Sequence, residues 1–135
     1  MYYVAQDKGG RPYMEDTHSV VKDLIPGIDY YAIFDGHGGD QVSIYLKDNF
    51  DKLLKQHLEG NAEIPDAIYK TFKDIVTSIP KEISIHTGST AIICIKKVDI
   101  IYIANCGDCR AIIDENGKAV QISEDHKPHY EVERI

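Results

Sequence analysis

The chain has 135 residues, of which 43% are hydrophobic and 27% charged, and its 15 basic and 22 acidic residues give a net charge of −7. This length and composition predict one globular domain over residues 1–135 and argue against a disordered chain. The acidic balance argues against nucleic-acid binding, and the apolar runs are too short to span a membrane, so we expect a soluble cytoplasmic protein, with the nucleus left open.

The first part of the chain predicts three short strands. Residues 2–5, 17–21 and 30–34 carry the β-branched and aromatic side chains typical of strands, and the last run, apolar throughout, predicts a strand buried on both faces. A Phe-Asp-Gly-His-Gly-Gly sequence at residues 34–39 follows. Its glycines permit a sharp exit that leaves Asp35 and His37 at the rim of the sheet.

Two amphipathic helices are predicted next. Apolar residues recur at steps of three and four between Val42 and Leu58, after Asp40 as the expected cap. A second helix begins near Pro65 and ends before Pro80. The spacing is that of ordinary core-facing helices, so we assign both a structural role.

The remainder predicts an antiparallel meander of short strands at residues 90–95, 100–104 and 110–113, followed by a hairpin through Asn116 to residues 119–122. Consecutive apolar residues at 91–95 require cover on both faces of the sheet. The helices can cover one face and a second sheet the other. The predicted fold class is therefore α+β, an α/β sandwich of antiparallel sheets flanked by helices.

Two polar segments are chemically complementary. Carboxylates of Glu15, Asp16 and Asp35, with the carbonyl of Gly36, are the oxygen ligands that Mg²⁺ or Mn²⁺ prefers. Arg11 can bind two oxygens of a phosphate. Taken singly, such residues are most often surface charges or turns, but their combination favours a metal and phosphate site.

These motifs resemble those of the protein phosphatase 2C family, whose members are metal-dependent serine/threonine phosphatases. Residues 88–91, 104–111, 125–128 and 131–135 look like later signatures of the family, in the family's order. The resemblance implies that Asp35 is shared between two metal ions, with Gly36 and Glu15 completing one position and Asp16 assisting. It also implies a metal-activated water as nucleophile, Arg11 as the phosphate ligand and His37 as the acid that protonates the leaving oxygen.

The resemblance covers only the N-terminal half of the family's domain. The aspartates that complete the second metal position have no counterpart in this sequence, so we expect a truncated domain with one nearly complete metal site and one incomplete site. A half sandwich exposes strand edges and an apolar face. We therefore expect a homodimer, with strand exchange as one route, acting on a phosphorylated protein substrate.

Two other functions stay open. The chain can be a catalytically impaired phosphatase-like module that binds metal or a phosphoprotein partner without turnover. A weaker alternative is a zinc or thiol module, in which Cys106 and Cys109 form a C-x-x-C that joins His126 and His129. Cys109 stands where the family usually has serine. We expect Asp108, in a tight turn, to bind its own backbone.

Overall fold

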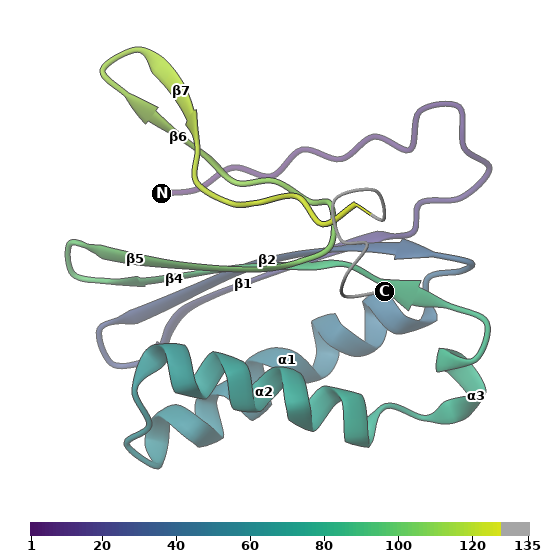
Figure 1. Ribbon diagram of the computed structural model, residues 1–135, viewed down its shortest axis with the longest axis horizontal. Coiled ribbons are helices and arrows are strands. Elements are labelled where there is room, and N and C mark those ends of the chain that lie inside the picture. Colours follow the sequence, from purple (N-terminus) through teal and green to yellow (C-terminus); the bar gives the residue numbers. More distant parts are fainter. Residues whose placement is uncertain (128–135) are drawn as a thin grey trace.

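The computed structural model describes residues 1–127, so His129 and the motif at residues 131–135 lie outside the described part. A five-stranded antiparallel sheet carries two long helices on one face (Figure 1). Along the main path of the sheet the order is β1 (Asp16–Ile25), β2 (Ile28–His37), β4 (Ala91–Lys97) and β5 (Ile100–Cys106), and the short β3 (Gly88–Ser89) pairs with the end of β2.

The helices form where the apolar periodicity predicts them. Helix α1 (Gln41–Glu59) follows Asp40, although the Asp40 side chain makes no capping hydrogen bond. Helix α2 (Ile64–Ser78) has Pro65 in its first turn and ends before Pro80, and the short α3 (Lys81–Ser84) follows. None of the helices within residues 1–127 combines the length and apolar character that a membrane span requires.

The core lies between these helices and the sheet. Tyr30 and Phe34 of β2, Phe50 of α1 and Ile93 of β4 are fully buried there. The prediction that residues 30–34 are buried on both faces is wrong, because Ile33 points away from the helices and is 51% exposed. Among the described residues, the N-terminal segment and the C-terminal hairpin with its flanking segments lie on that side in Figure 1.

The C-terminal strands form a separate two-stranded sheet. Strands β6 (Ile112–Glu115) and β7 (Lys118–Gln121) pair through a turn in which Asn116 has a φ of 54°, as the predicted hairpin requires. The predicted continuous meander is wrong, because β6 pairs with β7 and not with β5. The expected α+β class of antiparallel sheets with helices is confirmed.

The expected strand at residues 2–5 does not form. The segment crosses the sheet face opposite the helices (Figure 1), and the Tyr2 ring packs edge-on against Tyr31 with centroids 6.1 Å apart. Side-chain packing on the sheet face thus replaces the strand pairing that the sequence pattern suggested.

Candidate functional site

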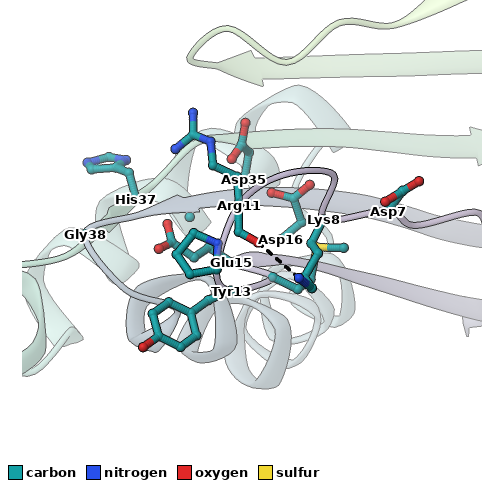
Figure 2. Close-up of a pocket in the computed structure, with 12 residues that line it drawn as sticks. Asp7, Lys8, Arg11, Tyr13, Glu15, Asp16, Asp35, His37 and Gly38 are labelled. Carbon is teal, nitrogen blue, oxygen red and sulfur yellow. Dashed lines mark hydrogen bonds between the residues drawn. The ribbon is translucent and has the colours of Figure 1, made fainter.

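All six residues predicted for the site line one pocket of about 470 Å³ at the rim of the sheet (Figure 2). Its walls come from the N-terminal segment and from the end of β2. The predicted residues are Arg11, Glu15, Asp16, Asp35, Gly36 and His37, and the sequence interpretation did not include Asp7, Lys8, Tyr13 or Met14, which also line the pocket.

The pairing of β1 with β2 creates the acidic part of this pocket. Asp16 lies directly opposite Asp35 in the antiparallel register, so the two side chains share one face of the sheet. Partial burial raises the pKa of Asp35 to about 6, and a hydrogen bond with Asp16 and the negative charges of Asp16 and Asp108 act in the same direction. The two carboxylates therefore resist joint ionisation unless a cation lies between them.

Hydrogen bonds to the backbone carbonyl of Glu15 fix the position of this residue. Its carbonyl accepts hydrogen bonds from the Gly36 N–H at 3.2 Å and from the buried Ser43 hydroxyl of α1 at 2.6 Å. A Cβ at Gly36 would lie only 2.6 Å from that carbonyl oxygen, so no larger residue fits. The close approach of two backbones thus places Glu15 beside the Asp16–Asp35 pair.

Arg11 lies in an exposed turn that closes the pocket from the N-terminal side. Its N–H donates to the Lys8 carbonyl at 3.2 Å, and the Lys8 ammonium donates to the Arg11 carbonyl at 3.1 Å. Figure 2 shows the Arg11 guanidinium and the Asp35 carboxylate both directed away from the helices. The turn thus brings positive charge to the open side of an acidic site.

His37 lies at the opposite end of the pocket from Asp7 and Lys8 (Figure 2). It is the register partner of Gly88 in the β2–β3 pair. A Cβ at Gly88 would lie 2.4 Å from the His37 Nε2 atom, so the imidazole occupies space that only glycine leaves open. Gly88 belongs to a predicted family signature, and the structure brings that signature to the site.

The site offers ligands for a hard cation without a preassembled metal cluster. Within residues 1–127, no group of three or more His, Cys, Asp or Glu side chains could hold a metal ion. The donors that meet here are oxygen atoms, and the facing carboxylates of Asp16 and Asp35 carry a charge that a cation would neutralise. The donor set therefore fits Mg²⁺ or Mn²⁺ in kind.

Asp108 differs from its expected role. Its carboxylate accepts a hydrogen bond from the Lys127 ammonium at 3.1 Å and does not cap its own turn, and its charge contributes to the raised pKa of Asp35. The sequence does not predict that Asp108 lies near Asp35, because Asp108 follows β5 and Asp35 lies near the end of β2.

The zinc interpretation stays a prediction, because His129 lies outside the described residues. Cys106 and Cys109 are free thiols. His126 uses Nδ1 to accept a hydrogen bond from the Gly107 N–H at 3.1 Å.

The chain is similar in sequence to proteins of one known family. The family model "Protein phosphatase 2C" matches residues 2–135. The rice proteins "Probable protein phosphatase 2C 55" and "Probable protein phosphatase 2C 54" are 38% and 32% identical over 94% and 90% of this chain, which covers 35% and 36% of their lengths. The chain thus spans about a third of the length of these relatives.

Two solved structures share the fold. The structure of a sex-determining protein of C. elegans aligns with this chain at a TM-score of 0.82 and 24% sequence identity. The alignment covers 96% of this chain and 35% of the C. elegans chain. A serine-threonine phosphatase 2C of Toxoplasma gondii matches 93% of this chain and 50% of its own with a TM-score of 0.75 at 21% identity.

Proposed function

The chain belongs to the protein phosphatase 2C family, and from that membership we propose that it takes part in metal-dependent hydrolysis of phosphoserine and phosphothreonine in proteins. The observation that carries the proposal is the carboxylate pair of Asp16 and Asp35, which faces the same pocket as Arg11 and His37. A scaffold without chemistry has no physical need to gather these groups, since facing carboxylates cost stability.

Asp35, Asp16, Glu15 and the Gly36 carbonyl would hold the Mg²⁺ or Mn²⁺ ion. When bound, such an ion lowers the pKa of a coordinated water so that hydroxide is available near neutral pH. Ionised Asp35 is the form that binds, so the pKa of about 6 leaves most of it ready at pH 7.

The other pocket residues act on the phosphoryl group. The planar guanidinium of Arg11 binds two phosphate oxygens and offsets the charge of the transition state. His37 gives a proton to the departing seryl or threonyl oxygen, which is a poor leaving group as an alkoxide. Lys8 keeps Arg11 in place through its bond to the Arg11 carbonyl.

Hydrolysis of a phosphoserine peptide in the presence of Mn²⁺ tests the proposal. Asp35→Ala is expected to lower turnover by at least about a hundredfold, a loss comparable to that of a positioned catalytic group. Asp99→Ala, an exposed carboxylate in the β4–β5 turn, is the matched control and is expected to leave turnover unchanged. Full activity in Asp35→Ala refutes the assigned site.

A phosphatase-like module that binds without turnover is the second candidate. Arg11 and the Asp16–Asp35 pair in one pocket can bind a phosphate group or a cation without turnover. Calorimetric binding of Mn²⁺ that Asp35→Ala abolishes, with no hydrolysis by the wild-type chain, would select the module.

We also propose that a second copy of the chain covers the sheet face opposite the helices. Ile33 and Ile101 lie on that face with 51% and 49% of their surface exposed. Within residues 1–127, the outer edge of β5 pairs with no other strand, which leaves backbone groups available to a partner strand.

A further inference from the structure

We propose that Thr90 is the positioning residue for Asp35, an inference that rests on the proposed phosphatase site. The Thr90 hydroxyl oxygen accepts a hydrogen bond from the Asp35 N–H at 3.1 Å, and the Thr90 N–H donates to the Asp35 carbonyl at 2.9 Å. Both backbone groups of Asp35 are thus bound by one residue. Because the backbone sets the direction of the Cα–Cβ bond, this residue aims the Asp35 carboxylate.

The contact replaces a regular strand pairing at this one position. Strand β2 pairs with β4 up to Ile33 and with β3 from Gly36 onward, and Asp35 lies opposite Thr90 in the gap between them. In an ordinary antiparallel pair the Asp35 N–H would bind the Thr90 carbonyl. Here the Ser89 hydroxyl donates to that carbonyl at 2.7 Å, and the Thr90 side chain supplies the acceptor instead.

The Thr90 side chain is itself held by the turn after β5. Its hydroxyl lies 3.0 Å from the Cys109 sulfur. Its methyl group packs on Gly107, where a Cβ would lie 2.6 Å from Thr90 Cγ2 and φ is +120°. Burial raises the pKa of the Cys109 thiol, so this neighbour stays neutral near pH 7.

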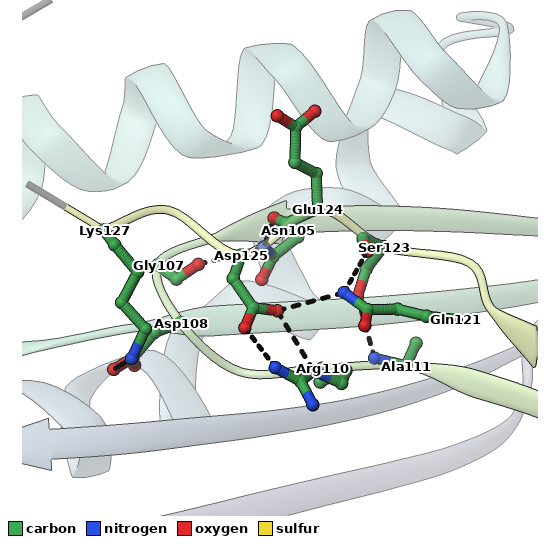
Figure 3. Close-up of polar contacts among 10 residues, drawn as sticks. All are labelled: Asn105, Gly107, Asp108, Arg110, Ala111, Gln121, Ser123, Glu124, Asp125 and Lys127. Atoms are coloured by element: carbon green, nitrogen blue, oxygen red, sulfur yellow. Dashed lines mark hydrogen bonds and ion pairs between the residues drawn. The ribbon is translucent and has the colours of Figure 1, made fainter. Parts of the chain in front are cut away.

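Residues of the segment after β7 hold the turn after β5 in place (Figure 3). The His126 N–H donates to the Gly107 carbonyl at 2.8 Å, and Arg110 forms an ion pair with Asp125. A side-chain amide hydrogen of Asn105 binds the Glu124 carbonyl at 2.7 Å. A continuous set of contacts therefore runs from the segment after β7, through the turn and Thr90, to the backbone of Asp35.

Three variants separate this role from general stability. Thr90→Val removes the hydroxyl and keeps the branched shape, whereas Thr90→Ser keeps the hydroxyl and removes the methyl group. Thr71→Val is the control, because it removes a threonine hydroxyl that is remote from the pocket, buried, and bound to the Ala67 carbonyl at 2.7 Å within α2.

The first measurement is amide hydrogen exchange at Asp35 in the metal-free chain. Thr90→Val is expected to speed this exchange by roughly tenfold, the loss of about one hydrogen bond, with no change in Thr90→Ser or Thr71→Val. Cys109→Ala, which removes only the thiol against the hydroxyl, is expected to speed it by about twofold and keeps the test available where Thr90→Val does not fold.

The second measurement is the affinity for Mn²⁺ by calorimetry. Thr90→Val is expected to bind roughly tenfold more weakly, as for loss of a group that orients a metal ligand, and Thr90→Ser to bind like the wild type. The proposal is overturned if Thr90→Val keeps the wild-type exchange rate at Asp35 and the wild-type Mn²⁺ affinity. It is also overturned if Thr71→Val changes both quantities as much as Thr90→Val does. If Asp35→Ala abolishes Mn²⁺ binding while Thr90→Val does not weaken it, only the positioning role of Thr90 is refuted. If Asp35→Ala binds Mn²⁺ like the wild type, both the metal site and the role of Thr90 are refuted.

Discussion

The raised pKa of Asp35 makes metal binding depend on pH where an ordinary aspartate would be fully ionised. A cation competes with the proton on this carboxylate, so affinity follows the ionised fraction. With a pKa of about 6, Asp35 is about one-tenth ionised at pH 5 and about nine-tenths ionised at pH 7. The apparent affinity for Mn²⁺ is therefore expected to rise about tenfold between these values and to level off above pH 7.

The metal-free chain should show the opposite trend from the same group. The folded-state pKa of Asp35 lies above its ordinary value of 3.8, so between about pH 4 and 6 the folded chain binds more protons than the unfolded chain. The contribution of Asp35 to the free energy of unfolding is therefore largest below pH 4 and is lost as pH rises through 6. Added Mn²⁺ should remove this loss, because it stabilises the ionised form.

Calorimetric titration with Mn²⁺ at pH 5, 6 and 7 and constant ionic strength measures the effect. Asp16→Asn removes the facing charge that raises the pKa of Asp35, so its affinity is expected to change less over this range, whatever its absolute value. Asp99→Asn, in a turn remote from the pocket, should keep the wild-type profile. A wild-type affinity that is constant from pH 5 to 7 would refute the reasoning.

Three further predictions concern the acid, the core and assembly. Gly88→Ala places a Cβ 2.4 Å from His37 Nε2 and displaces the imidazole, so turnover of a phosphoserine peptide is expected to fall by about a hundredfold. Turnover of an aryl phosphate should fall much less, because its leaving group needs less help from an acid. Equal losses for the two substrates would contradict the role of His37. Tyr30→Phe removes a hydroxyl that is buried without a hydrogen-bond partner among the described residues. The free energy of unfolding from urea titration should therefore be unchanged or higher by about 1 kcal/mol. A clear decrease in that free energy would show that the Tyr30 hydroxyl has a hydrogen-bond partner. Light scattering at micromolar concentration should give twice the 15.2 kDa mass of the chain, and a monomer mass would sink the proposed dimer.

The sequence predicts the elements whose signals are local. The three- and four-residue apolar steps of α1, Pro65 in the first turn of α2, and the Asn116 turn all depend on neighbours a few residues apart. The gathering of Asp16 and Asp35 is nearly as local, because β1 and β2 form one hairpin. Residue types and family motifs indicate the candidate site in the sequence, and this short-range pairing is what brings the residues together.

Residue patterns do not show which faces are covered or which distant loops meet. Residues 2–5 look like a strand, but that segment lies across the face of the sheet and packs through Tyr2 on Tyr31 instead of pairing at an edge. The bond between Asp35 and Thr90 joins residues 55 positions apart, and it depends on the pairing of β2 with the segment that contains β3, Thr90 and β4. The periodicity of apolar residues carries no signal for which distant strands pair.

Packing of the buried core determines which side chains of β2 face the pocket, because it fixes the strand register. Phe34 is fully buried against the helices, and its neighbour Asp35 therefore faces the other side of β2. A slip of one residue would turn Phe34 outward and direct Asp35 into the apolar core, at the cost of both a buried aromatic ring and a desolvated carboxylate. Packing of Phe34 on Phe50 thus stabilises the one register in which Asp16 and Asp35 meet in the pocket.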